Sequence, residues 1–217
     1  MTLNLVTLNE PASPAAEAYR RLRVNLSAER ELPLHTLLVV AADSDGDKDS
    51  VAANLAVTYA RVGKQVILAD CDLRRPRQHT VFGAANNEGV TTALADESAP
   101  LPLQATAVPG LRLLTSGPGV EVPSDLLASP AMGRLMARLC EEADVVLLDA
   151  PPVAVATDAT ELASQVDGVL LTVTAGQTKR DAAQRARQLL EQVGARIVGA
   201  VLVNVPLDAA LRKYAAG

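Results

Sequence analysis

The stretch VVAADSDGDKDSVAANL, residues 39–55, decides how this chain folds. It begins as an apolar β-branched run, continues as a short polar loop and ends as the start of a helix, which is the order of a phosphate-binding unit. Lys48 stands where such a loop carries a lysine that reaches phosphate. However, every second position from 43 to 49 is an aspartate, where glycine, a hydroxyl and bare backbone N–H groups are expected.

Length and composition limit the classes of protein to consider. A chain of 217 residues suits one α/β domain over residues 1–217, and its 49% apolar but 2% aromatic residues predict a core of Leu, Val and Ala. The net charge of −5 argues against a nucleic-acid partner or an anionic membrane surface. Cys71 and Cys140 are expected to be unpaired, as in a reducing compartment. Without a signal peptide or an apolar run of ~18–20 residues, we expect a soluble cytoplasmic protein with no direct membrane insertion.

Apolar runs alternate with helical patterns along the chain. The runs lack polar alternation, as expected for parallel strands that are covered on both faces. They are residues 36–42, 65–69, 111–114, 145–148, 168–173 and 197–203. Helices are expected over about 14–26, 50–62, 130–142 and 178–193, after an extended lead-in over 1–13. This order predicts a doubly wound, mostly parallel sheet with helices on both faces.

Three of the predicted strands end in acids. The first leads into the aspartate-rich loop, the second into ILADCDLRRP with Asp70 and Asp72 just past it, and the third, VVLLDAPP, carries Asp149 at its tip. Ligands of such sheets bind at the carboxyl ends of the strands. An aspartate there is costly unless it serves a cation or hydrogen bonds. Each aspartate alone can be explained as a helix cap, but three acidic ends beside Lys48 predict a Mg–nucleotide type of site, working or vestigial.

These motifs resemble the cytoplasmic kinase domain of bacterial tyrosine kinases, P-loop proteins that partner capsular and exopolysaccharide co-polymerases. ILADCDLRRP resembles their second (A′) Walker motif, VVLLDAPP their Walker B motif, and VEVPSDLL at 120–127 their P-S-E-L-L segment. EAYRRLR matches their E-x-x-R-x-x-R through Glu17, Arg20 and Arg23, which in the family mediates ring-like self-association. The resemblance covers nearly the whole chain and implies the P-loop NTPase fold of the ParA/MinD subclass.

The resemblance also implies cofactors, roles and partners. ATP and Mg²⁺ would be bound by Lys48 and the hydroxyl of Ser50. Asp70 and Asp72 would be catalytic, serving the metal and the incoming hydroxyl, and Asp149 with Asp70 would hold the metal or its water. The chain would form a homo-oligomer and would lie at the inner face of the membrane through a co-polymerase or activator protein.

The first loop departs from the family pattern, which is approximately P-G-x-G-K-S-T. Asp47 replaces the glycine before the lysine, and Asp49 replaces the hydroxyl that ligates Mg²⁺. Four carboxylates against one ammonium give residues 43–49 a formal charge of −3. A carboxylate about 7 Å from a phosphate charge costs on the order of 2 kcal/mol at an effective dielectric near 20. We therefore expect impaired nucleotide binding, with ATP and Mg²⁺ bound weakly or not at all.

Two other interpretations of the loop stay open. Asp49 could ligate Mg²⁺ directly while Asp45 and Asp47 point to solvent, which would leave weak ATP binding. The D-x-D-x-D spacing is also found in Ca²⁺ loops, but Gly46 is not at the sixth position and Asn54 stands at the twelfth in place of Glu. A solvated acidic loop is favoured over a calcium site.

Three functions follow from these observations. The first is a nucleotide-binding-impaired pseudokinase with a regulatory or assembly role in exopolysaccharide synthesis or export. The second is an active ATP-dependent protein-tyrosine autokinase, for which Tyr214 is the candidate phosphoacceptor, although the family carries a tyrosine cluster where this chain has LRKYAAG. The third is a MinD/ParA-like ATPase. The acidic loop disfavours the second and third, and the E-x-x-R-x-x-R segment disfavours the third.

Overall fold

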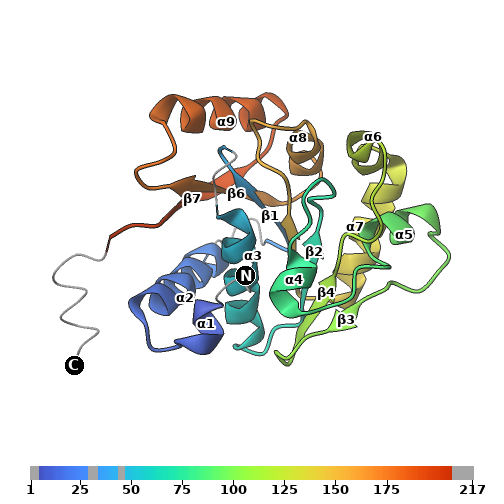
Figure 1. Cartoon of the computed structure of the whole chain (residues 1–217), viewed down its shortest axis with the longest axis horizontal. Coiled ribbons are helices and arrows are strands. Elements are labelled where there is room, and N and C mark those ends of the chain that lie inside the picture. The colour runs from blue at the N-terminus through green and yellow to red at the C-terminus, as the bar shows by residue number, and fades with distance from the viewer. Residues whose placement is uncertain (1–4, 29–33, 44–46, 207–217) are drawn as a thin grey trace.

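A computed structural model describes residues 5–28, 34–43 and 47–206, and one seven-stranded sheet runs through them (Figure 1). The strand order is β3-β4-β2-β5-β1-β6-β7. Only β3 pairs antiparallel, with β4, and the other neighbours are parallel. The strands are β1 (Thr36–Ala41), β2 (Val66–Asp70), β3 (Gln104–Ala105), β4 (Leu111–Leu114), β5 (Val145–Asp149), β6 (Gly168–Thr174) and β7 (Ile197–Val203). The predicted doubly wound, mostly parallel sheet is confirmed.

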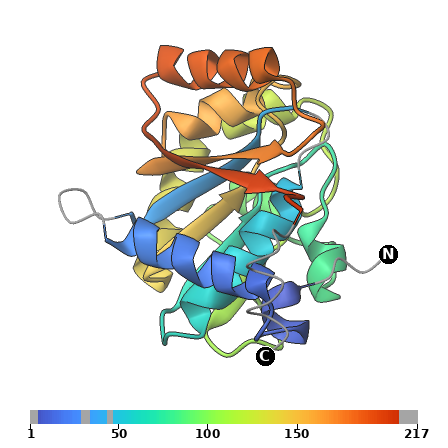
Figure 2. The same cartoon turned by 90° about the vertical axis from the view of Figure 1, so that its left-hand side faces the viewer.

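Helices cover both faces of the sheet (Figure 2). The helices on one face are α1 (Val6–Asn9), α2 (Pro14–Ser27), α3 (Lys48–Ala60) and α4 (Gln78–Phe82). The helices on the other face are α5 (Val90–Ala95), α6 (Pro123–Leu127), α7 (Pro130–Glu142), α8 (Asp158–Ala163) and α9 (Arg180–Gln192).

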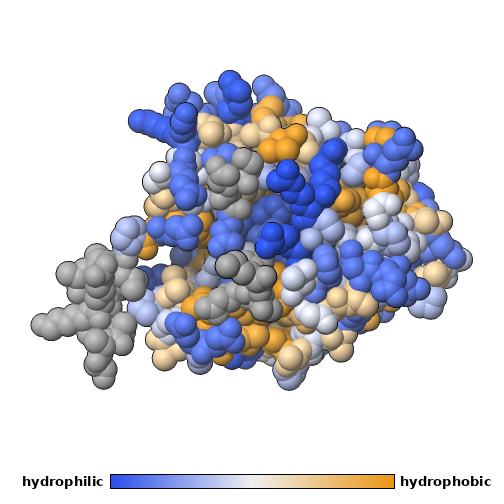
Figure 3. All heavy atoms as spheres, viewed as in Figure 1, coloured by the Kyte–Doolittle hydropathy of each residue, from blue (hydrophilic) through white to orange (hydrophobic). Residues whose placement is uncertain are grey.

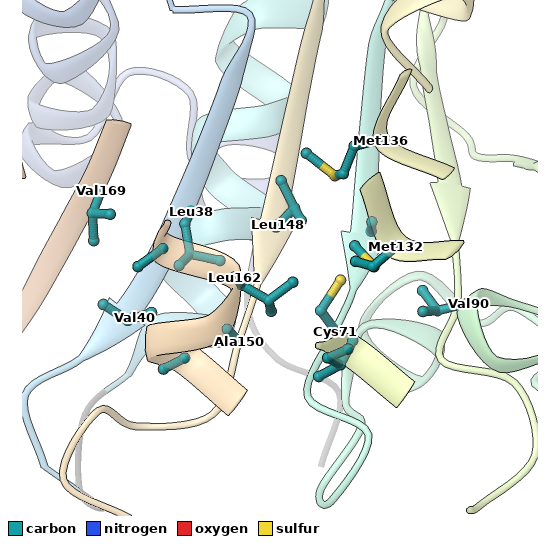
Figure 4. Close-up of a cluster of buried hydrophobic side chains, with 14 of the residues drawn as sticks. Leu38, Val40, Cys71, Val90, Met132, Met136, Leu148, Ala150, Leu162 and Val169 are labelled. Atoms are coloured by element: carbon teal, nitrogen blue, oxygen red, sulfur yellow. The ribbon is translucent and has the colours of Figure 1, made fainter. Parts of the chain in front are cut away.

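The strands divide their side chains between two apolar cores. Along β1, Leu38 belongs to the core under α7 and α8, whereas Leu37 belongs to the core under α3. Figure 4 shows Met132 and Leu162, from α7 and α8, close to the side chains of the central strands in the first core. Every residue of β1 and β5 is buried. This double coverage explains why the strands are uninterrupted apolar runs.

Most predicted elements are found where the sequence placed them. The helix expected over 14–26 is α2, and Ser13 caps it by accepting a hydrogen bond from the Ala16 N–H at 3.2 Å. The extended lead-in was wrong in part, because residues 6–9 form α1. Leu8 of this helix and Leu5 just before it pack on the α3 core. The elements β3, α4, α6 and α8 were not predicted, since each has only two to six residues and shows no periodicity.

Two simpler expectations concern the membrane and the cysteines. Within the described ranges, no helix combines the length and apolar character needed to cross a membrane. Cys71 and Cys140 are both free thiols, as expected.

Candidate functional site

The carboxyl ends of β1, β2 and β5 meet at one edge of the sheet. The parallel register sets Asp70, the last residue of β2, beside Asp149, the last residue of β5. Strand β1 lies on the other side of β5 and leads toward α3. Hydrophilic residues gather near the centre of the face seen in Figure 3, in the region between α3 and α8. The strand order therefore brings together the acidic strand ends that the sequence singled out.

Lys48, the first residue of α3, directs its ammonium into this group of carboxylates. Its Nζ lies 2.6 Å from Asp49 Oδ1, 2.9 Å from Asp149 Oδ1 and 3.0 Å from Asp72 Oδ2. The side chain is only 4% exposed, and three carboxylates match the three N–H donors of an ammonium. Burial alone would lower the pKa of Lys48, but the carboxylates of Asp149, Asp49 and Asp72 outweigh it and raise this pKa. Lys48 is therefore a charged internal counter-ion.

For the two strand-tip carboxyl groups, Asp70 and Asp149, burial raises the pKa and Lys48 lowers it. Burial raises the pKa of Asp70 to about 7, although the backbone N–H of Gln78 and the ammonium of Lys48 favour its charged form. Burial also raises the pKa of Asp149 well above its usual range, against the attraction of Lys48. One ammonium cannot neutralise all the buried carboxylates around it. This excess of buried carboxylates over cations favours the protonated forms of Asp70 and Asp149.

Backbone N–H groups fix the two aspartates of the loop after β2. Asp70 Oδ2 accepts hydrogen bonds from the N–H of Arg77 at 3.0 Å and of Gln78 at 2.9 Å. Asp72 Oδ1 accepts one from the N–H of Arg75 at 3.0 Å, which leaves Oδ2 for Lys48. Asp70 Oδ1 is buried without a partner among the described residues.

Gln78, which the sequence analysis missed, completes the group. Its Nε2 donates to Asp149 Oδ2 at 2.6 Å and to the backbone oxygen of Asp49 at 3.1 Å. Gln78 is fully buried, and its Oε1 has no partner in the described part of the chain. The sequence gives no signal for this residue beyond its place after the Arg-Arg-Pro-Arg segment, because a glutamine has no characteristic spacing from the carboxylates it binds.

The hydroxyl of Ser50 is directed toward the N-terminal helices. It accepts a hydrogen bond from Asn54 Nδ2 at 3.3 Å, and it bonds the hydroxyl of Tyr19, whose pKa burial raises to about 12 in spite of this contact. Asn54 Oδ1 in turn accepts from the backbone N–H and the hydroxyl of Thr7, at 3.0 and 2.8 Å. Ser50 is thus tied to α1 and α2, and its expected contact with a cofactor stays a prediction.

The acidic loop is described only at its two ends. Residues 44–46, and with them Asp45 and Gly46, lie outside the described residues. Asp47 occupies the N-cap position of α3. Burial and the neighbouring Asp49 raise its pKa, against hydrogen bonds from the backbone N–H and the hydroxyl of Ser50 that lower it. The interpretation of this loop as a calcium site is therefore not tested.

A second buried ion pair lies beside the site. Asp158 at the start of α8 is fully buried, and its two oxygens accept from Nε and Nη2 of Arg74 at 2.8 and 2.9 Å. The sequence analysis missed Asp158 as a partner of Arg74. The bidentate pair joins the loop after β2 to the start of α8.

The proposed self-association residues lie on α2. Arg20 bonds Glu17 Oε2 through Nη2 at 2.6 Å and the backbone oxygen of Pro11 through Nη1 at 2.8 Å. Arg23 is half-buried, and its Nε has no partner within the described ranges. Tyr214 lies outside the described residues.

The ammonium that would meet a phosphate is engaged in this arrangement. Lys48 hydrogen-bonds Asp49 and Asp149 and forms an ion pair with Asp72, and Asp49 adds a carboxylate where a hydroxyl is expected. Among the residues that the structure describes, no group of three or more His, Cys, Asp or Glu side chains could hold a metal ion. Phosphate would have to displace Lys48 from its carboxylates, and a cation at Asp149 would have to displace Lys48 or Gln78.

Comparisons with known proteins agree with the fold. The family described as "ParA: NUBPL iron-transfer P-loop NTPase" matches residues 34–207, which makes this a ParA-like P-loop NTPase domain. The chain is 34% identical over 204 residues to the tyrosine-protein kinase YwqD of Bacillus subtilis (strain 168), covering 93% of this chain and 86% of that protein.

Solved structures give the same result. The crystal structure of the chimerical protein CapA2B2 superposes with a TM-score of 0.90 at 31% identity, over 94% of this chain and 90% of that one. The kinase domain of the Escherichia coli tyrosine kinase ETK superposes with a TM-score of 0.86 at 29% identity, over 94% and 83%. The chain belongs to the bacterial tyrosine kinase family.

Proposed function

We propose that this chain is a nucleotide-binding-impaired pseudokinase of the bacterial tyrosine kinase family, with a regulatory or assembly role in exopolysaccharide synthesis or export. The observation that supports this most directly is the contact of Lys48 Nζ with Asp49, Asp72 and Asp149 at 2.6–3.0 Å. A lysine whose ammonium already contacts three carboxylates is engaged before any phosphate oxygen can reach it. To reach phosphate it would have to leave them as uncompensated buried charges, which is costly.

Electrostatic repulsion adds to this cost. Asp47 and Asp49 stand where the family offers a glycine and a hydroxyl, so they would face the same phosphates that Lys48 is meant to bind. Each carboxylate at about 7 Å from a phosphate charge costs on the order of 2 kcal/mol at an effective dielectric near 20. Two or three such contributions weaken binding by several powers of ten.

The proposed role involves two kinds of protein partner, further copies of this chain and a membrane protein. Glu17, Arg20 and Arg23 on α2 would mediate homo-oligomerisation, in keeping with the E-x-x-R-x-x-R segment of the family. A membrane co-polymerase or activator protein would hold the chain at the inner face of the membrane. An assembly role needs the fold and these contacts, and it does not need turnover of ATP.

An active ATP-dependent tyrosine autokinase is the alternative. It is favoured by the carboxylates of Asp70, Asp72 and Asp149, which lie at the same sheet edge as Lys48. In that case Tyr214 would be the phosphoacceptor. A MinD/ParA-like ATPase is supported less, because α2 carries the E-x-x-R-x-x-R segment that those proteins lack.

Calorimetric titration with ATP and Mg²⁺ tests the proposal. We expect no binding at millimolar ATP, and binding in the micromolar range after Asp47→Gly combined with Asp49→Ser, because that pair of changes removes two negative charges and restores the expected loop chemistry. The control is Glu121→Ser with Asp125→Gly, two exposed acids elsewhere, which changes the net charge equally. Micromolar binding by the unmodified chain, together with phosphotyrosine at Tyr214, would establish the active kinase instead.

A further inference from the structure

One neutral residue links the three elements that carry the buried acids. Gln78 donates from Nε2 to Asp149 at the tip of β5 and to the backbone oxygen of Asp49 in the first turn of α3. Its backbone N–H donates to Asp70 at the tip of β2. We propose that Gln78 is a positioning residue that keeps Asp149 closed to divalent cations, an inference that rests on the proposed impairment of this site.

Both carboxylate oxygens of Asp149 accept hydrogen bonds. Its Oδ1 accepts from Lys48 at 2.9 Å and its Oδ2 from Gln78 at 2.6 Å, so both oxygens face N–H donors. A cation that approaches either oxygen meets the positive end of an N–H bond. Because Asp149 is fully buried, water does not reach the remaining lone pairs of its oxygens. Lys48 supplies the charge that balances this carboxylate, and Gln78 covers the oxygen that Lys48 leaves.

Gln78 also links the tip of β5 to the start of α3. Lys48 and Asp49 are the first two residues of this helix, and Gln78 bonds the Asp49 backbone oxygen at 3.1 Å. The same amide nitrogen therefore ties the start of α3 to the tip of β5. This tie keeps the Lys48 ammonium beside Asp149. Loss of the amide would free Asp149 Oδ2 and would also loosen the helix that positions Lys48.

The side-chain amide of Gln78 is oriented with its nitrogen toward Asp149 and the Asp49 backbone. Gln78 Oε1 is buried with no partner among the described residues, although a buried amide oxygen normally accepts a hydrogen bond. The opposite orientation would turn this oxygen toward the carboxylate of Asp149. The orientation observed serves the acids around Gln78 at the expense of its own oxygen, as expected of a residue that holds those acids in place.

Binding of Mn²⁺ without nucleotide tests this role. The variants are Gln78→Met, which keeps the volume and removes the amide, and Gln78→Glu, which replaces the donor by a carboxylate. Gln104→Met is the matched control, because the amide of Gln104 also makes hydrogen bonds, to the backbone of Ala85 and to the hydroxyl of Thr115. Calorimetry measures affinity, and the rise in Tm with added Mn²⁺ measures binding independently.

We expect Gln78→Met to bind Mn²⁺ about tenfold more tightly than the unmodified chain, the scale on which residues around a metal site act, and Gln78→Glu to bind more tightly still. The control should match the unmodified chain. A merely structural glutamine would lower the Tm without making it respond to Mn²⁺. Folded variants at Gln78 that bind Mn²⁺ no better than the control would overturn the proposal, and Gln78→Glu alone decides it if Gln78→Met does not fold. Tight binding of ATP by the unmodified chain would refute the impairment, and the metal titration would still judge Gln78 separately.

Discussion

Two ionic groups at the carboxyl edge of the sheet differ in their charge balance. Asp158 is matched one to one by Arg74, in a bidentate pair with distances of 2.8 and 2.9 Å. Lys48 is instead shared by Asp49, Asp72 and Asp149, with Asp70 beside them. In the matched pair one guanidinium faces one carboxylate. In the unmatched group several buried carboxylates share one ammonium, and burial raises the pKa values of the strand-tip residues Asp70 and Asp149.

Removal of Lys48 should give the largest effect in this comparison. Lys48→Met leaves three carboxylates without their ammonium, and breaking a buried ion pair in this way costs about 3–5 kcal/mol of unfolding free energy. We expect the loss of unfolding free energy to be greater at pH 8 than at pH 5. Carboxylates left without the ammonium bind protons more readily at the lower pH, which removes their uncompensated charge. Urea unfolding at both pH values measures this. Equal stability of the variant and the unmodified chain at pH 8 would contradict the role of Lys48 as a counter-ion.

The next largest effect is expected on the pH dependence of the unfolding free energy. Asp70 has a pKa of about 7 in the folded chain, above its value in the unfolded chain, so the folded state binds more protons between about pH 4 and pH 7. Unfolding free energy should therefore fall as the pH rises through this window, by up to about 4 kcal/mol from this group. Asp70→Asn should flatten the slope. Asp144→Asn, at an aspartate whose side chain is 44% exposed, serves as the control and should leave the slope unchanged.

Breaking the matched pair of Arg74 and Asp158 should lower the unfolding free energy less than removal of Lys48 does. Arg74→Met leaves Asp158 buried and unpaired, but the side chain of Arg74 is 42% exposed, so water can enter where it lay. We expect a loss of about 2 kcal/mol, smaller than for Lys48. Adding Asp158→Asn should recover part of the loss, which a double-mutant cycle measures as coupling between the two residues. Additive effects of the two changes would show that the pair does not act as a unit.

The smallest effect on stability is expected at the exposed pair on α2. Glu17 and Arg20 are 53% and 38% exposed, and exposed ion pairs contribute little, so Glu17→Ala with Arg20→Ala should change the unfolding free energy by less than about 0.5 kcal/mol. The same variant should lower the mass of the protein in solution, as measured by light scattering, if α2 mediates self-association. An unaltered oligomer would reject that role for the helix.

Local pattern was enough for most of the fold and for part of the site. Continuous apolar runs predicted the parallel strands, because a strand covered on both faces excludes polar residues along its length. The same reasoning named Lys48, Asp70, Asp72 and Asp149, and all four lie at one edge of the sheet. Helix α4 escaped prediction because five residues are too few to show a helical period.

The sequence by itself determined that this chain is a parallel α/β protein and that carboxylates outnumber cations in its phosphate loop, because both are properties of neighbouring residues. Only the tertiary structure decided how those charges are used. It turned Lys48 onto three carboxylates, matched Asp158 to Arg74 and placed Gln78 against Asp149. Apart from Asp49, which directly follows Lys48, these partners are far apart in the chain. Strand order and helix packing bring them together, so no local pattern encodes which of them will meet.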